Sequence, residues 1–315
     1  MRYIKSFSTT GDVQTAIANQ ELGRPYVAYV SQEQAIDWDS AIEPKNWFRA
    51  DNIPQELEYQ RDVTVAFVKT GTPTSFSIDI STDGVNWTTE NISNSESVHE
   101  ISTVIPVNGY MLFGNSTAMA WGFYSSTLNG WRIEFRTSIG APTVKLSGDI
   151  MTLLADGAVL QNNMFNGLFY SQFDYNNATI YDASDLILPD SGLAAYCYSN
   201  MFNYCYNLTG APALNATTLA DNCYSYMFKG CVDLVSAPEL PAATLATNCY
   251  REMFNGCNEL IYIKCLATNI SATNCTRDWV TGVSGSGTFV KDPNMTGWTE
   301  SVSGYPIGWT VENAQ

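Results

Sequence analysis

Three nine-residue stretches decide the fold: CYSNMFNYC at 197–205, CYSYMFKGC at 223–231 and CYREMFNGC at 249–257, each starting 26 residues after the one before. Five residue columns keep the same phase through them. The columns are Cys197, Cys223, Cys249 and Cys275; Cys205, Cys231 and Cys257; Met201, Met227 and Met253; Phe202, Phe228 and Phe254; and Leu208, Leu234 and Leu260. Self-similarity at a period of roughly 20 to 50 residues is typical of solenoids, in which each repeat buries its apolar face only against its neighbours. The sequence therefore predicts a solenoid with these columns in its core.

The spacing inside one repeat predicts a helix over 219–231. The apolar residues of this stretch recur every four positions and are Leu219, Cys223, Met227 and Cys231. Such spacing gives a helix of about three turns one apolar face, and Gly230 stands where a left-handed helix cap is usual. Pro238 and Pro241 follow, and they favour a short extended segment at the edge of a parallel stack. Each repeat is thus expected to be an α/β unit.

All eight cysteines lie in the repeat region. A metal site would need close pairs such as CxxC, which the chain lacks, so no metal or other cofactor is expected. In a reducing compartment cysteine behaves as a small buried hydrophobe. The pattern predicts free thiols packed in the core, with disulfides as the alternative.

Composition limits the functions that the chain can have. Its 315 residues include 15 basic and 31 acidic side chains, for a formal charge of −16, which phosphate backbones and anionic lipids would repel. The opening MRYIKSFSTTGD lacks the apolar run of a secretory signal, and no stretch of about 18 apolar residues follows, so neither Sec export nor membrane insertion is predicted. A catalytic Ser–His or Cys–His couple would have to use the single histidine, His99, so the chain is not expected to be an enzyme.

Two segments precede the repeats. Residues 1–45 are interpreted as a small α/β unit with strands at 2–7 and 26–30 and a helix at 13–22, too small to be stable alone and therefore expected to dock or oligomerise. From 46–147, short alternating runs between turns predict an antiparallel β-sandwich of six to eight strands. Strands are expected at 63–68, 74–81, 86–89, 98–107, 109–113, 119–124 and 131–137.

One motif in this sandwich needs a choice between two interpretations. Ser81, Asp83, Gly84 and Trp87 resemble the Asp-box hairpin of sialidase-type propellers, but the spacing is one residue short and only one copy occurs. A propeller would repeat the motif in each blade. An Asp-Gly hairpin turn with Trp87 in the sandwich core is therefore predicted.

Residues 148–315 are the predicted solenoid with its C-terminal cap. Large aromatic side chains near the end, among them Trp298 and Trp309, suit the capping of an open stack, although exposed aromatics also bind sugars by stacking. Other candidate binding residues are those that differ between copies while the core columns stay constant. They are Tyr204, Lys229, Asp233, Asn255 and Glu259.

The repeat unit, CYSxMFxGCxxLxxAPELPxxTLA, resembles the BspA-type leucine-rich repeat found in surface proteins of gut bacteria and in virion proteins of the tailed phages that infect them. The resemblance covers about residues 144–311, including the strings IKCLATNIS, GTFVK and GWTV. MRYIKSFSTT and RPYVAYVSQE near the N-terminus resemble openings of structural proteins of crAss-like phages. The family implies an α/β leucine-rich-repeat solenoid that displays a surface for adhesion, with no catalytic residues to carry over.

The resemblance leads us to expect a virion surface protein, such as a head or tail fibre or a decoration. Its N-terminal region would bind other virion proteins, the solenoid would bind a host surface glycan or protein, and a homotrimer is favoured by analogy with fibres. The alternative is a bacterial cell-surface adhesin. A glycan-processing enzyme would need two convergent carboxylates. The acidic residues near the junction of the sandwich with the solenoid are Asp149, Asp156, Asp182, Asp185 and Asp190. We interpret them as a solvated acidic face.

Overall fold

The protein divides into two compact units, Met1–Asn46 and Trp47–Gln315. The computed structural model describes residues 4–7, 27–30, 48–54, 62–114, 116–117, 130–137, 143–155, 157–171 and 179–315. In the first unit, β1 (Ile4–Phe7) and β2 (Val27–Val30) pair in parallel. The helix expected at 13–22 and the strand expected at 119–124 lie outside the described residues.

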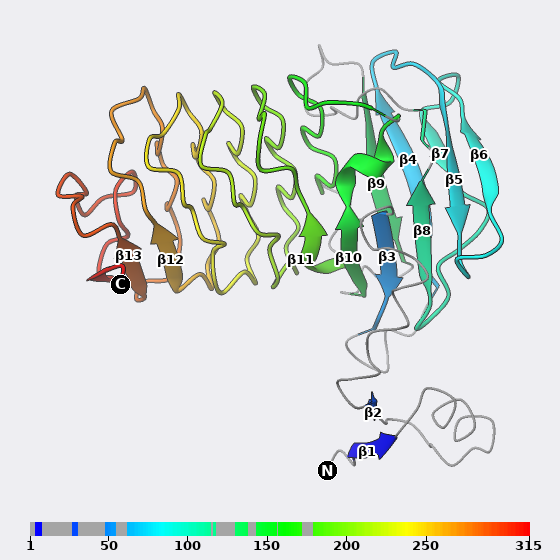
Figure 1. Ribbon diagram of the computed structural model, residues 1–315, viewed down its shortest axis with the longest axis horizontal. Helices are drawn as coiled ribbons and strands as arrows, with labels where there is room; N and C mark the ends of the chain where they lie inside the picture. Colours follow the sequence, from blue (N-terminus) through cyan, green and yellow to red (C-terminus); the bar gives the residue numbers. More distant parts are fainter. Residues whose placement is uncertain are drawn as a thin grey trace. The chain divides into compact units, whose positions relative to one another are not determined.

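The second unit is mostly β-strand, and η3 (Ile150–Leu153) is a single turn of 3-10 helix. Its strands are β3 (Phe48–Asn52), β4 (Thr64–Thr70), β5 (Phe76–Ser81), β6 (Thr88–Ile92), β7 (Val98–Glu100), β8 (Tyr110–Gly114), β9 (Gly130–Arg136), β10 (Val144–Asp149), β11 (Ile180–Ile187), β12 (Tyr262–Cys265), β13 (Thr288–Lys291) and β14 (Thr310–Asn313). They form a six-stranded sheet in the order β11-β10-β3-β8-β5-β6, a three-stranded sheet β7-β4-β9 and a parallel sheet β12-β13-β14 (Figure 1).

The first two of these sheets pack against each other through aromatic side chains. The Phe76 ring on β5 lies 5.6 Å from Phe67 on β4 and 5.6 Å from Trp131 on β9, edge to face in both cases, a favoured geometry for buried rings. Strand β10 pairs antiparallel with β3 and parallel with β11. The boundary expected after residue 147 therefore falls inside β10, and one sheet continues from the sandwich region into the repeats (Figure 1).

The helix predicted over 219–231 is wrong, because this stretch is a chain of overlapping turns, which we call the turn ribbon. Cys223 N–H donates to the Ala220 carbonyl at 3.3 Å, and the same three-residue step recurs two residues later at Ser225. An α-helix would bond four residues back. Every fourth residue takes a positive φ, namely 58° at Asn222, 59° at Tyr226 and 73° at Gly230. The turn ribbon thus has a period of four residues, which imitates the apolar spacing of a helix.

The amides of the turn ribbon alternate between local and long-range partners. Cys223 bonds within its own copy, whereas Asn222 N–H donates to the Thr247 carbonyl at 2.9 Å and Tyr224 N–H to the Cys249 carbonyl at 3.2 Å, both in the next copy. Successive copies, which we call coils, therefore lie side by side (Figure 1). A coil without its neighbour would leave every second ribbon amide without its partner, at a cost wherever water cannot replace it.

The core columns stack in register between coils. The Phe228 ring lies 5.8 Å from Phe202 and 5.9 Å from Phe254, with interplanar angles of 7° and 3°, and all three side chains are fully buried. The cysteines are free and buried. The Cys231 thiol donates to the Phe202 carbonyl of the preceding coil at 3.2 Å, and burial raises the pKa of Cys197 to about 12, which makes the thiolate scarce and the thiol unreactive. The cysteines thus serve as packing atoms.

Gly230 and Gly256 occupy one column, but substitution should affect them differently. Both have positive φ, 73° and 82°, so alanine at either position costs about 1 to 2 kcal/mol of backbone strain. A Cβ on Gly230 would also lie 2.5 Å from Cδ1 of the Tyr204 ring, whereas one on Gly256 would meet only the Gly230 backbone, with Cα at 3.6 Å and N at 3.7 Å. We expect Gly230→Ala to lower the free energy of unfolding in urea more than Gly256→Ala, and Tyr204→Ala to remove the difference. Equal losses in the two single variants would contradict this arrangement.

Candidate binding surfaces of the repeat region

The outward side chains of the turn ribbon form ion pairs across the seams between coils. Lys229 Nζ lies 2.7 Å from Glu252 Oε2 in the next coil. The Tyr226 ring lies below both Lys229 Nζ, at 5.4 Å, and the Arg251 guanidinium, at 5.5 Å, within reach of a cation–π interaction. Lys229 is therefore already paired, so this surface offers a mixture of charges and no free cationic site at that residue.

Tyr204 and Asn255, two further candidates, are both half-buried. The Tyr204 ring lies 5.9 Å from Tyr206 and 6.2 Å from Tyr170, and it crosses Gly230 in the next coil. One edge of the ring is therefore occupied by the protein itself. The Asn255 carbonyl accepts from Gly230 N–H at 2.8 Å, so its backbone position is set by the ladder between the coils.

Asp233 and Glu259 place two like charges in neighbouring coils. Glu259 N–H donates to the Val232 carbonyl at 3.2 Å, which puts Glu259 beside Asp233. Burial, and then the charge of Glu259, raise the pKa of Asp233 above its ordinary value. A carboxyl whose pKa is raised by folding stabilises the fold below that pKa, and this stability is lost as the pH rises through it. At neutral pH the pair therefore opposes folding.

Asp233→Asn should accordingly stabilise the protein at pH 7. Because Asp233 is half-buried and Glu259 is exposed, solvent screens the pair, and the gain should not exceed about 0.2 to 1 kcal/mol, the scale of cross-strand charge pairs. The gain should shrink below pH 4, where wild-type Asp233 is protonated. Urea denaturation at both pH values measures it. Glu259→Gln should give a similar gain and the double variant little more; fully additive gains would contradict the repulsion.

Trp298 and Trp309 are buried, which corrects their assignment to the binding surface. Trp298 is 7% exposed and stacks on Trp279 with ring centroids 5.6 Å apart. Trp309 is 6% exposed, and its Nε1 donates to the Ser284 carbonyl at 2.7 Å. Sugar stacking needs an accessible ring face, whereas these rings cover the apolar end of the coils. Both residues belong to the cap of the stack.

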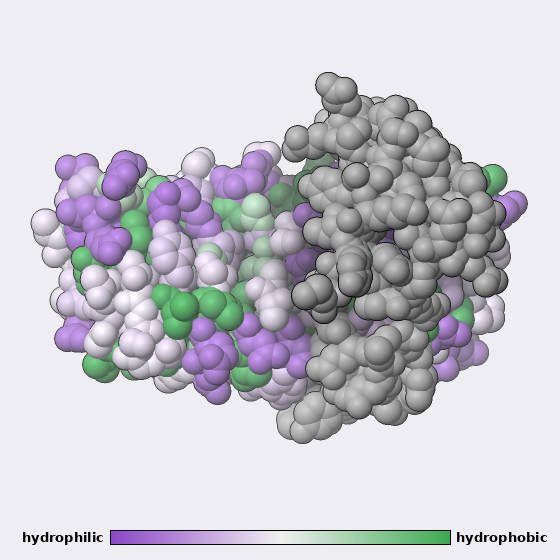
Figure 2. All heavy atoms as spheres, turned by 90° about the horizontal axis from the view of Figure 1, so that it is seen from below, coloured by the Kyte–Doolittle hydropathy of each residue, from purple (hydrophilic) through white to green (hydrophobic). Residues whose placement is uncertain are grey.

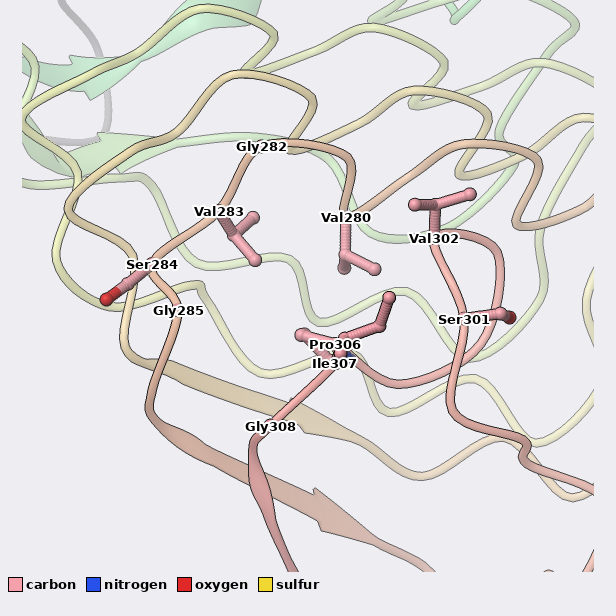
Figure 3. A pocket seen from close by; sticks show the side chains of 10 residues that line it. All are labelled: Val280, Gly282, Val283, Ser284, Gly285, Ser301, Val302, Pro306, Ile307 and Gly308. Carbon is pink, nitrogen blue, oxygen red and sulfur yellow. The ribbon is translucent and has the colours of Figure 1, made fainter.

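A hollow of about 420 Å³ lies between the last coil and this cap (Figure 3). Val280 and Val283 line it from the coil, and Val302, Pro306 and Ile307 from the cap. Figure 3 shows these apolar side chains around the hollow, while the Ser284 and Ser301 hydroxyls point away from it. No charged side chain is among its lining residues. The hollow therefore suits an apolar group and gives a charged ligand nothing to pair with.

The acidic residues considered for a glycosidase do not form a free pair. Lys145 Nζ lies 2.5 Å from Asp185 Oδ2 and 3.3 Å from Asp182 Oδ2, and the two carboxylates thus share one ammonium. Although burial alone would raise it, hydrogen bonds from Ser184 together with Lys145 lower the pKa of Asp182, the opposite of what a general acid requires. Asp149 caps η3 by accepting from Met151 N–H at 2.9 Å.

The remaining acidic candidates add no site. Asp190 is exposed, and Asp156 lies outside the described residues. Within the described ranges, no group of three or more His, Cys, Asp or Glu side chains could hold a metal ion. In the same ranges no helix has the length and apolarity to cross a bilayer.

The hairpin motif between β5 and β6 is a hydrogen-bonded turn. Asp83 accepts from Asn86 N–H at 2.7 Å and from Val85 N–H at 2.9 Å, and these bonds, that of Asn86 first, lower its pKa well below the usual range. Trp87 is half-buried and not in the core, a correction to the prediction. His99 on β7 lies 3.8 Å from Glu90 and 3.9 Å from Glu96, with no nucleophile in that arrangement.

The hollow is the feature that sequence reasoning missed. Its lining comes from 280–285 and 301–308, two segments whose contact depends on how the cap folds back, and no period links them. A cluster of small and β-branched residues was the only available signal. Comparison with models of protein families, with curated proteins and with solved structures finds no match to this chain.

Proposed function

We propose that the protein is a non-enzymatic display module on the surface of a virion, as a head or tail fibre or a decoration, which attaches to a host surface. The proposal rests mainly on the difference between inward and outward positions within each coil. Inward columns repeat Cys, Met and Phe, whereas outward positions change, as from Lys229 to Asn255 in the next coil. A scaffold of this kind keeps its core while its surface is free to differ, which suits recognition.

The finer architecture that we propose is a β-sandwich followed by a leucine-rich-repeat solenoid in which the turn ribbon takes the place of the helix. Supporting this are the bonds between coils 26 residues apart, such as Ser199 Oγ with Ser225 Oγ at 2.8 Å. In Figure 2 apolar groups on the visible face of the repeats are small and separated by polar ones. That face offers no broad apolar patch of the sort that marks a large interface.

We assign attachment to the hollow at the C-terminal end and favour a protein receptor over a glycan. Its aliphatic lining offers neither the aromatic stacking nor the convergent polar groups that hold sugars. An apolar side chain of a host surface protein would fill it.

Two measurements test the proposal. Mass spectrometry of purified particles should find the protein, and antibodies against the repeat region should label intact particles; absence from particles, with labelling of bacterial cells instead, would leave the adhesin alternative. Labelled full-length protein should bind host cells, and protease treatment of the cells should abolish the binding while periodate treatment should not.

A matched pair of variants tests the hollow itself. Ile307 lines the hollow and is 65% exposed, and Val85 is 79% exposed in the β5–β6 turn, so aspartate at either position should be tolerated by the fold. Ile307→Asp should weaken cell binding by at least about tenfold, or 1.4 kcal/mol, and Val85→Asp should not. Unchanged binding of Ile307→Asp would exclude the hollow as the attachment site.

A further inference from the structure

The parallel sheet β12-β13-β14 ends in an open edge. All four residues of β14 are exposed, and the strand pairs with β13 on one side. Thr310 N–H donates to the Gly287 carbonyl at 2.9 Å and Ala314 N–H to the Lys291 carbonyl at 2.8 Å. Since peptide groups alternate along a strand, the even-numbered residues face β13, and the N–H and C=O groups of Val311 and Asn313 point outward. Such an edge is a template for another strand.

The apolar core also reaches the protein surface at this edge. Ile263, Phe289 and Val311 form one row across the three strands, so their side chains lie on the same face of the sheet. Ile263 and Phe289 are fully buried, but Val311 is 37% exposed. The row stops at Val311 because no further strand covers it within the described part of the chain.

We propose that β14 pairs antiparallel with β14 of a second copy of this chain, about a two-fold axis at Val311. The two outward peptide groups of Val311 would then exchange two hydrogen bonds with those of the other Val311, as in a hydrogen-bonded antiparallel pair. The row Ile263–Phe289–Val311 would continue into the same row of the partner. A single self-complementary strand is sufficient for such an isologous contact.

Charge disfavours the register next to this one. With the axis at Val311, Glu312 stands opposite Thr310 of the other copy. The neighbouring symmetric register has its axis at Glu312 and opposes two carboxylates, which is unfavourable. The formal charge of −16 on each chain adds a general repulsion that salt screens, so the dimer should become tighter as the ionic strength rises.

The test compares the full-length protein with variants at outward-facing positions. Light scattering after size exclusion, from low to high micromolar concentration, should give the wild type a larger mass than Val311→Pro, and twice the mass where the first unit forms no assembly of its own. Proline removes only the outward N–H of an edge strand and leaves the bonds to β13 in place. Equal masses for the two proteins would overturn the proposal. This outcome includes a wild type that stays monomeric because β14 pairs with a different protein.

Cross-linking tests the register. Val311→Cys should form an oxidised dimer, because the two introduced residues are directly paired across the axis. In Asn313→Cys the introduced residues lie about 13 Å apart along the strands, at roughly 3.3 Å per residue, which is beyond disulfide reach. The eight native cysteines are buried and do not compete. Equal cross-linking of the two variants, or none in Val311→Cys, would overturn the register. Unchanged melting temperatures show that both variants fold.

Cell binding through the hollow is a separate readout, so this inference can fail without affecting the proposed function.

Discussion

Replacement of Phe228 by alanine should lower the free energy of unfolding by about 3 to 5 kcal/mol, the usual cost of removing a fully buried aromatic ring. The ring is stacked between Phe202 and Phe254, so its loss opens a cavity on two seams at once. Collapse of the cavity is limited, because the ladder of backbone bonds holds the spacing between the coils. Urea denaturation, followed by tryptophan fluorescence and circular dichroism, measures the loss.

Lys229→Ala is the matched control, since it lies next to Phe228 in the chain and on the same turn ribbon. It removes a part-exposed ion pair with Glu252, which is worth about 1 kcal/mol or less. Equal melting temperatures for Phe228→Ala and Lys229→Ala would refute the view that the stacked column, and not the surface, holds the coils together.

Removal of one whole coil should leave a folded protein, whereas removal of half a coil should not. Deletion of residues 222–247 joins Asp221 to Asn248 and takes out one period of 26 residues. Four ribbon amides, at every second residue from Tyr198 to Tyr204, have acceptors in the deleted segment and then meet the same column positions one period later. Tyr204 likewise meets Gly256 in place of Gly230. Because each coil contacts only its neighbours, the free energy of unfolding should fall by the contribution of one coil and of one interface between coils.

Deletion of residues 222–234, half a period, should abolish cooperative unfolding. The turn ribbon of the preceding coil would then face the segment that follows residue 234, with exposed Ser236 taking the place of Cys223. Alternate ribbon amides would lose their carbonyl partners, each at a cost of about 1 to 3 kcal/mol where it is buried. Circular dichroism and thermal melts of both deletions decide the question. A folded half-period deletion would show that the ladder between coils does not set the register.

The core residues could be predicted from the sequence, but the backbone conformation of the turn ribbon could not. Strict 26-residue columns identify Phe228 and Cys231 as interior residues without any structure. Both a helix and the turn ribbon place every fourth residue on one side over a short stretch, so the apolar pattern could not separate them. Asn222 and Gly230 carried the missing signal, because these residue types tolerate the left-handed conformation, whereas Tyr226 adopts a positive φ that its residue type does not favour.

The strand partners and the structure of the C-terminal cap could not be predicted from the sequence for a different reason. Strand β3 pairs with β8 and β10, far apart in the sequence, and no local pattern specifies such partners. The aromatic residues of the cap were identified, but whether Trp298 lies outside or inside depends on how 292–309 folds back over Trp279. The apolar hollow exists only once that fold-back is made.

The alternating amides of the turn ribbon also determine how the molecule responds to a mechanical load. A pull on the last coil along the stacking direction acts on its bonds to the preceding coil, which are five ribbon bonds and those between β12 and β13. The other seams stay bonded, because no ribbon bond skips a coil. Coils should therefore detach singly, each releasing about 90 Å of chain at roughly 3.5 Å per residue. The repeat region should therefore extend by equal steps under force. Each step dissipates mechanical energy before the force reaches the remaining coils.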